Sequence, residues 1–476
     1  MMRCRTRLLP YFLLVLLLPG CAPSLREARP DRLAFPPLVF HVPQVETVEL
    51  PNGIRLYLKE DRELPLVRVT AMLEAGSIGD PADKTGLGDL FAAALRTGGA
   101  GDATPDALDR TLERLAADLG VATDTYATSL DLSVQAGDLE AGMGILADLL
   151  RRPAFAPERL ELARKQAIEG IRRQNDEPES IASRALMKAI YGDHPLGRTP
   201  TVATVAAIRR DDLIDFHRRY FHPDNLWLAI SGDFDRTALL ALIERTLGDW
   251  PRAAFSPQSV PVVTAAPAPV VLVGQKDVPQ TTVLIGELGI DKSAPDLHAV
   301  RVMNYILGAG GFNSRLMREV RSNRGLAYSV YSYFQVGRRL PGPFIAGCET
   351  KSASTLEVVR LLRRLMAEMR EEPVSAGELA LARESLVNSF VFGFTDSHEV
   401  VSQLLRLDFY GYPPGYLETY RDRVAAVTAE DVLAAAREHL HPDRQAVVLV
   451  GDVSAFDAAP ADLGLPVSPI PTEEQD

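Results

Sequence analysis

One spacing repeats along this chain and constrains its fold more than any other feature. The stretch FHPDNLWLAISGDFD, which begins at Phe221, is matched by LHPDRQAVVLVGDVS, which begins at Leu440. His222 lies 219 positions before His441, and Gly232 lies 219 positions before Gly451. The same spacing separates two further pairs, Tyr191-Gly192 from Tyr410-Gly411 and Asp212 from Asp431. Four landmarks with a common spacing indicate a duplicated unit of about 200 residues, so we expect two related domains.

Composition sets the expected boundaries of these domains. Residues 251–268 are rich in Pro and Ala, which predicts a linker between a first unit at 45–250 and a second at 269–456. Residues 21–44 are expected to form an N-terminal linker. The tail PADLGLPVSPIPTEEQD predicts disorder over 457–476.

Each unit mixes strand and helix patterns. GIRLYLKE (53–60) alternates Ile54, Leu56 and Leu58 with Arg55, Tyr57 and Lys59, and SLDLSVQA (129–136) alternates similarly, so both predict half-buried strands. Between them, Thr104 and Pro105 are typical of a helix start. The expected core stripe of that helix is Leu108, Leu112, Leu115 and Leu119. NLWLAISG and QAVVLVG predict late apolar strands, and the mixture predicts an α+β fold.

The N-terminus has the features of an export signal. Arg3, Arg5 and Arg7 precede an apolar run, Leu8–Leu18, that is too short to span a bilayer. Leu18-Pro19-Gly20-Cys21 resembles a bacterial lipobox, which implies a signal peptide over 1–20 and lipid on Cys21. Because Ala rather than Asp follows Cys21, the resemblance implies a periplasmic protein anchored in the outer membrane. The alternative is a plain signal peptide with a chance cysteine.

Charge and cysteine content exclude some functions. The chain has 51 basic and 63 acidic residues, a net charge of −12, which argues against nucleic acid as a partner. Cys4 leaves with the signal peptide, so Cys21 and Cys348 remain. Since Cys21 would carry lipid, no disulfide is expected in the mature chain. Cys348 lies in the apolar stretch PFIAGCET and is interpreted as a small core residue.

The stretch GLGDLFAAALRTGG (86–99) predicts a short amphipathic helix. Its apolar positions share one face, and two glycines follow them as a stop signal; the apolar residues are Leu87, Leu90, Phe91, Ala94 and Leu95. The other side carries little chemistry, with Asp89, Ala92, Ala93 and Arg96.

The duplication, the HPDN…GD ending and the segment VELPNGIRLYLKED…AGSIGDPADKTGLGDLF resemble the insulinase-type peptidases, family M16. The resemblance covers roughly Val45 to Val453. It implies two α+β lobes, each with a mixed, mainly antiparallel sheet and packed helices. It also implies an H-x-x-E-H zinc motif on the helix after the GS…G loop, where two His bind zinc and the Glu is the general base.

In this chain the motif positions carry other residues. Asp89 stands at the first His, Ala92 at the Glu and Ala93 at the second His, and the third ligand falls near Glu169. Asp89 and Glu169 offer two carboxylates without imidazole, which is a poor zinc site, and Ala92 cannot act as a base. The eight histidines form neither HExxH nor HxxEH. His439-x-His441 is interpreted as a pair of residues that mark the end of a helix. We therefore expect no metal and no catalytic residue in this chain.

A second motif is intact. LGAGGFNSRLMREVRSNRGLAYSVYSYF (307–334) resembles the C-terminal motif of the same family, which implies that Arg321 and Tyr328 bind the substrate backbone. Arg can donate to peptide carbonyls, and Tyr can donate to the carbonyl oxygen that becomes negative in hydrolysis. The alternative is structural: Arg321 as a surface charge and Tyr328 as a strand residue half buried against the sheet. Arg324 is a weaker candidate for the role of Arg321.

The resemblance implies a division of labour. The interpretation we favour is a non-catalytic, substrate-binding subunit that forms a heterodimer with a zinc-bearing M16 subunit and completes its active site in the periplasmic degradation of peptides or proteins. The zinc would be bound by the partner. Two alternatives remain: a binding or structural lipoprotein without a proteolytic role, and an active metallopeptidase with an unusual site.

Overall fold

The computed structural model describes residues 40–253, 255–257, 260–264 and 268–471. The predicted signal peptide, Cys21 and most of the N-terminal linker lie outside the described residues. The described residues from His41 onward belong to one compact unit. No helix within the described part of the chain is both long and apolar enough to cross a membrane.

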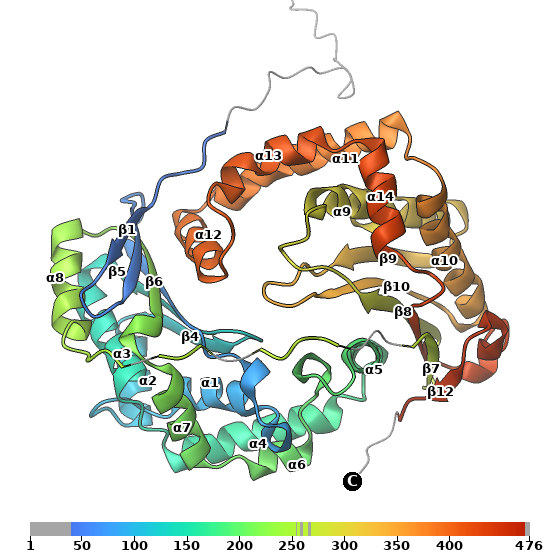
Figure 1. Ribbon diagram of the computed structural model, residues 1–476. Coiled ribbons are helices and arrows are strands. Elements are labelled where there is room, and N and C mark those ends of the chain that lie inside the picture. Colours follow the sequence, from blue (N-terminus) through green and yellow to red (C-terminus); the bar gives the residue numbers. More distant parts are fainter. Residues whose placement is uncertain (1–39, 254, 258–259, 265–267, 472–476) are drawn as a thin grey trace, which may run out of the picture. The chain divides into compact units, whose positions relative to one another are not determined.

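The first half of this unit is built on a six-stranded sheet (Figure 1). Its strands are β1 (Glu46–Glu49), β2 (Arg55–Glu60), β3 (Leu66–Leu73), β4 (Asp118–Thr123), β5 (Thr128–Gln135) and β6 (Leu226–Gly232). They follow the order β1-β2-β6-β3-β5-β4, in which β2 and β6 are parallel and the other pairs antiparallel.

The second half repeats this plan. Its strands are β7 (Val270–Gln275), β8 (Gln280–Leu288), β9 (Ala327–Phe334), β10 (Pro343–Lys351), β11 (Ala446–Gly451) and β12 (Val467–Pro469). They follow the order β12-β7-β11-β8-β10-β9. The five strands β7-β11-β8-β10-β9 have the same order along the chain and the same places in the sheet as β2-β6-β3-β5-β4 of the first half. The expected α+β fold of two related units, each with a mixed and mainly antiparallel sheet, is confirmed.

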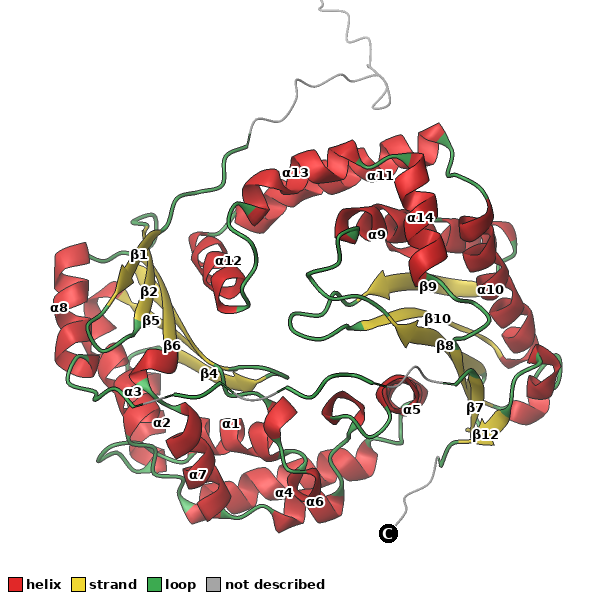
Figure 2. Cartoon of the chain, in the orientation of Figure 1, coloured by secondary structure: helices red, strands yellow, loops and turns green. Residues whose placement is uncertain are grey.

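Helices cover one face of each sheet with apolar side chains (Figure 2). In the first half they are α1 (Leu87–Thr97), α2 (Pro105–Arg114), α3 (Leu139–Arg151), α4 (Pro157–Arg173), α7 (Arg210–Tyr220) and α8 (Arg236–Leu247), while α6 (Val202–Ala207) packs on α4. In the second they are α9 (Leu297–Asn304), α10 (Thr355–Glu371), α11 (Ala376–Ser389), α13 (Tyr416–Ala426) and α14 (Ala429–His439). The Asp212 carboxylate accepts from Arg209 N at the start of α7, and the Asp431 carboxylate accepts from Thr428 N at the start of α14, so the two aspartates hold the same position in the repeat. At α14 the Thr428 hydroxyl also accepts from Asp431 N and completes a capping box.

Three expectations need correction. The predicted helix after Thr104 ends at Arg114, because Ala116 adopts a φ of 46° and the chain turns into β4, so Leu119 is a strand residue. The tail predicted to be disordered over 457–476 instead contains β12, which pairs in parallel with β7. Tyr57, predicted to face solvent, is 5% exposed because a helix from the second half covers it.

Two helices are exchanged between the halves. α5 (Pro178–Tyr191) packs on β8 and β11 of the second sheet, and α12 (Ser397–Phe409) packs on β6 and β2 of the first. Both helices begin 219 positions apart, so they are the same element of the repeat. The division into domains at 45–250 and 269–456 stays a prediction, since each half depends on a helix from the other.

The two exchanged helices are held by different chemistry. α5 contributes Ile181, Leu186 and Ile190 to an apolar cluster with the second sheet. α12 and the residues just before it also bury apolar side chains but add polar contacts: Asp396 pairs with Arg68, and Tyr57 donates to Asp408 at 2.7 Å. The docking of α12 is therefore more sensitive to charge.

His398 makes that docking sensitive to pH. Its Nε2 lies 3.0 Å from Thr70 Oγ1 and its Nδ1 3.0 Å from Ser231 Oγ, and burial beside Arg68 lowers its pKa to about 4. Between the unfolded pKa of about 6.5 and the folded value, the unfolded chain binds a proton that the folded chain does not. The stability from His398 is thus present above pH 6.5 and is lost as pH falls through that window.

We expect His398→Gln to reduce the loss of stability between pH 7 and pH 5 by about 2 kcal/mol relative to the wild type. Urea denaturation at the two pH values measures this. The matched control is the exposed His41→Gln, which should keep the wild-type pH dependence. An unchanged pH dependence in His398→Gln would show that the imidazole does not titrate in this way.

Candidate functional site

The helix at the degenerate motif is firmly positioned. Gly86 precedes α1 with a φ of 100°, a conformation that favours glycine, and the buried Asp80 carboxylate accepts hydrogen bonds from Gly86 N at 2.9 Å and Gly88 N at 3.2 Å. Burial nevertheless raises the pKa of Asp80 to about 6. The apolar face of α1 lies in the core as predicted. The sequence has therefore kept the scaffold of the motif.

The motif positions themselves carry no metal-binding geometry. Asp89 and Ala93 are exposed and Ala92 is buried. The Asp89 carboxylate is solvent-accessible, yet neighbouring protein partly desolvates it and raises its pKa. Glu169 lies on α4, which contacts α1, but it is exposed and pairs with Arg172 at 3.0 Å.

This donor set does not fit zinc. Two separate carboxylates provide neither the imidazoles nor the base that the implied site requires. Within the described ranges, no group of three His, Cys, Asp or Glu residues could hold a metal ion. The two histidines expected at a helix end contact different carboxylates. His439 lies 2.7 Å from Asp296, and His441 lies 2.8 Å from Glu287.

The second motif begins with a tightly packed glycine turn. A Cβ at Gly308 would lie 2.3 Å from Ser332 Oγ, so this position requires glycine. Ser314 Oγ donates to the Gly311 carbonyl at 2.7 Å and accepts from Met317 N at 3.3 Å. The chain then forms a π-helix over Met317–Asn323, a form that is frequent at functional sites.

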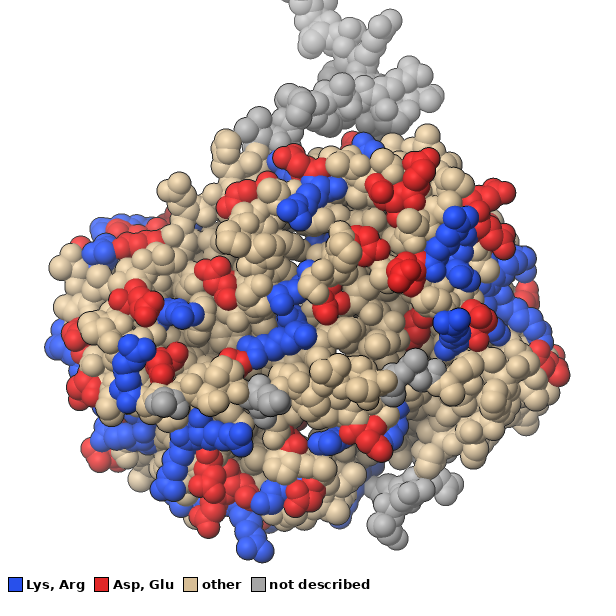
Figure 3. Space-filling view, viewed as in Figure 1, with Lys and Arg blue, Asp and Glu red and all other residues tan. Residues whose placement is uncertain are grey.

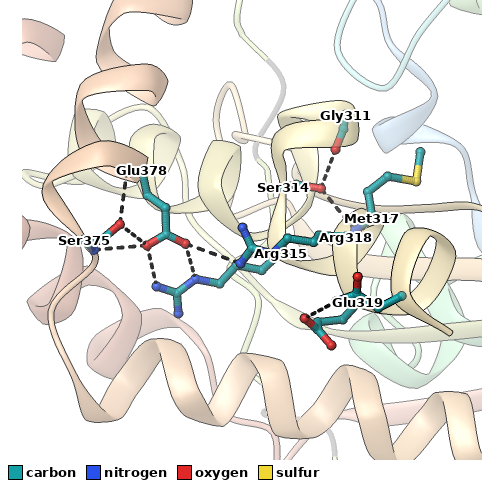
Figure 4. A network of polar contacts seen from close by, with 9 residues as sticks. Gly311, Ser314, Arg315, Met317, Arg318, Glu319, Ser375 and Glu378 are labelled. Atoms are coloured by element: carbon teal, nitrogen blue, oxygen red, sulfur yellow. Dashed lines mark hydrogen bonds and ion pairs between the residues drawn. The ribbon is translucent and has the colours of Figure 1, made fainter.

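One arginine of the motif is structural. Arg315 forms a two-pronged pair with Glu378 at 2.8 and 3.0 Å (Figure 4), and Arg318 lies 3.8 Å from the same carboxylate. Hydrogen bonds from Arg315 and Ser375 lower the pKa of Glu378 to about 2. Glu378 also belongs to the capping box of α11, so this network fixes the π-helix segment against α11.

Arg321 and Tyr328, the two residues expected to bind the substrate backbone, lie in contact with each other. The Arg321 guanidinium lies 4.3 Å from the centre of the Tyr328 ring and 4.7 Å from that of Phe312. Tyr328 is 80% exposed and Phe312 66% exposed. In the described residues Arg321 takes part in no ion pair, whereas Arg324 pairs with Glu357 at 3.2 Å. Arg324 is therefore a weaker candidate than Arg321 for binding the substrate backbone.

This arrangement can bind a peptide backbone. Two aromatic faces hold the guanidinium in place by cation–π contact while its N–H donors stay available. The alternative in which Tyr328 is half buried is wrong, because its ring is exposed on the edge strand β9. Sequence reasoning missed Phe312: it lies nine residues before Arg321, and the intervening turn and π-helix follow no regular period.

The degenerate motif and the Arg321 site remain separate in this chain. No hydrogen bond, ion pair or ring contact between described residues joins Arg321 or Tyr328 to α1. Cys348 is buried in β10 as expected, and its burial raises the pKa of the thiol to about 12, so it is not a nucleophile. On the face shown in Figure 3, Lys and Arg are interspersed with Asp and Glu, without a field of one sign.

Comparison with known families decides the identity of the fold. Residues 55–203 match the insulinase family, peptidase family M16, and residues 207–386 match the peptidase M16 inactive domain. The chain belongs to peptidase family M16. Between them the two matches span most of the chain and agree with the duplicated sheets.

Relatives of this M16 chain include proteins named as proteases and as non-peptidases. An uncharacterized zinc protease of Mycobacterium leprae is 28% identical over 422 residues, covering 84% of this chain and 90% of that protein. A non-peptidase homologue of Helicobacter pylori is 24% identical over 383 residues, covering 79% and 86%.

Solved structures share the fold. The peptidase M16 inactive domain from Pseudomonas fluorescens has a TM-score of 0.79 and 28% identity, and the match covers 87% of this chain and all of that one. The periplasmic protease PqqL from Escherichia coli has a TM-score of 0.72 and 18% identity, with 86% of this chain matching 46% of that one. The region of PqqL that matches this chain is thus about half of the PqqL chain.

Proposed function

We propose that this M16 protein is a non-catalytic, substrate-binding subunit that completes the active site of a zinc-bearing M16 partner. The observation that carries the proposal is the Arg321 site. It keeps guanidinium donors that pair with no described residue and an exposed phenol, while the positions that would hold zinc carry Asp89, Ala92 and Ala93. A chain that only filled a structural role would have no need of this exposed cluster.

The division of labour has a chemical basis. Hydrolysis needs an activated water, and the described part of this chain offers no set of residues that fits zinc. It also needs a peptide held in register and a polarised carbonyl, which Arg321 and Tyr328 are suited to provide. The zinc would therefore reside in the partner, and the heterodimer would act on peptide substrates. The names of relatives, a zinc protease and a non-peptidase homologue, are compatible with both kinds of chain in one family.

Mixing the two chains tests the proposal. Alone, the chelator-washed protein is expected to hold no stoichiometric zinc by elemental analysis and to leave a quenched peptide uncut. Adding the M16 chain that co-purifies with it and carries HxxEH should give hydrolysis above that of the partner alone. About one zinc per chain with chelator-sensitive turnover, or no effect on the partner, would contradict the proposal.

We further propose that Cys21 anchors the protein in the outer membrane on its periplasmic side. The basis is the lipobox-like Leu18-Pro19-Gly20-Cys21 after a basic and then apolar leader. Cys21→Ser should release the protein into the soluble periplasm or leave it unprocessed, as fractionation and mass spectrometry of the N-terminus would measure. A Cys21→Ser protein that still fractionates with membranes and is cut at the same site would contradict the anchor.

A further inference from the structure

Two neighbouring cavities lie in the second half, around α9, α13 and the loop between α12 and α13. One, of about 280 Å³, is lined by Arg301, Phe390, Gln403, Leu407, Tyr412, Tyr416, Leu417 and Tyr420. The other, of about 270 Å³, is lined by residues that include Lys292, His298, Arg423 and again Tyr416. Tyr416 thus forms a wall between the two cavities.

The charged side chains that line these cavities are all basic. Arg301, Lys292 and Arg423 supply three cations, and no Asp or Glu lines either cavity. Arg301 is partly buried, lies 5.1 Å from the centre of the Tyr420 ring, and makes no ion pair with a described residue. Lys292 Nζ lies 5.8 Å from the centre of the Tyr412 ring. An arginine held among aromatic rings without a carboxylate retains its capacity to pair with an anion.

Two neutral polar groups are also available there. His298 Nδ1 is buried and has no hydrogen-bond partner among the described residues, and the buried Tyr416 hydroxyl lies beside the Arg301 guanidinium without forming a hydrogen bond of good geometry. Burial, reinforced by the positive charges of Arg301 and Arg423, lowers the pKa of His298 to about 4, so the imidazole is neutral at pH 7. Buried polar groups are ordinarily satisfied, so unpaired ones beside a cavity indicate a place for a polar ligand.

We propose that these cavities form a binding site for a small organic anion, in which Arg301 and the Tyr416 hydroxyl hold a carboxylate or phosphate group. The guanidinium fork matches either group. The body of the ligand packs against the apolar side of the first cavity, where Leu407, Leu417 and Phe390 lie. The site shares no residue with Arg321, Phe312 or Tyr328, so it is independent of the proposed peptide site.

Calorimetric titration of the full protein at pH 7 tests this site with three probes of stated chemistry. Benzoate and phenyl phosphate carry an anionic group on an aromatic body, while benzyl alcohol is a neutral analogue. Binding is expected for one or both anions and not for benzyl alcohol. A fourth titration, with inorganic phosphate, shows whether an anionic group without an aromatic body is sufficient for binding. If inorganic phosphate binds more tightly than both aromatic anions, the apolar part of the proposed site is contradicted.

Arg301→Gln should weaken binding of the aromatic anion at least tenfold, because the charge is lost and the stacking shape is retained. Tyr416→Phe, which removes only the hydroxyl, should weaken it several-fold and serves as the second variant if Arg301→Gln does not fold. The matched control is Arg360→Gln on the exposed side of α10. No anion binding in the wild type, equal binding of benzyl alcohol, or wild-type affinity in a folded Arg301→Gln or Tyr416→Phe would overturn the proposal.

Discussion

Replacing Tyr328 by Phe should lower the kcat of the reconstituted heterodimer by about 10²–10³, the usual effect of removing one donor to a developing oxyanion. The substitution is conservative in this structure. The ring is 80% exposed, and its contact with Arg321 is through the aromatic face, which Phe retains. The hydroxyl is thus the sole group removed, and the fold and assembly should be unaffected.

Arg321→Ala in the same complex should mainly raise KM, since Arg321 would hold the substrate backbone equally in the ground and transition states. The structure adds a second effect. Without the guanidinium, Phe312 and Tyr328 lose the cation that orders them, so a smaller loss of kcat is expected as well. Steady-state kinetics on one peptide, with size-exclusion chromatography of each variant, separate these effects from a failure to assemble.

Tyr333→Phe is the matched control for both variants. Tyr333 lies on the same strand β9, is 41% exposed, and stacks on Tyr331 rather than on Arg321. Tyr333→Phe also removes one phenol hydroxyl, and the kcat of this variant should differ from the wild-type value by less than twofold. If Tyr328→Phe and Arg321→Ala both behave like Tyr333→Phe, the motif is a remnant and the chain is better understood as a structural subunit.

The features predictable from sequence are those that repeat or are local. The common spacing of 219 predicted the duplicated sheets, and Thr104 with Pro105 predicted the start of α2. The periodicity of the α1 stretch predicted its buried face. Each depends on residues within one element, or on the copying of an element, so no knowledge of distant contacts is required.

Two of the features that were missed depend on distant contacts, and a third on an irregular local backbone. Alternation in β2 assigned Tyr57 to solvent, but α12 arrives from more than 300 residues later and buries it. The proline-rich composition of the tail concealed β12, which is ordered by pairing with β7. Phe312 was missed because a π-helix shifts the phase on which helical patterns rely.

The exchanged helices lead to the second large expected effect. Leu186→Ala should lower the free energy of unfolding by about 2–5 kcal/mol, because it deletes a fully buried side chain and leaves a cavity. Leu186 belongs to the first half in sequence, yet it lies over Gly286 of the second sheet, where a Cβ would be 3.1 Å from Leu186 Cδ2. Urea denaturation measures the loss. The matched control, Leu162→Ala on α4, removes a leucine that is 47% exposed and should cost about 0.5 kcal/mol or less.

The location of the damage is the more informative result. If α5 is an integral part of the second half, Leu186→Ala should speed amide exchange in β8 and β11 more than in β3 and β5. The two halves should also unfold in one transition, because α5 and α12 each bury apolar surface that the other half exposes without them. Faster exchange confined to the first sheet, or two separate transitions in the wild type, would contradict this. Either result would mean that the halves fold independently and that each exchanged helix adds little to the stability of the sheet on which it packs.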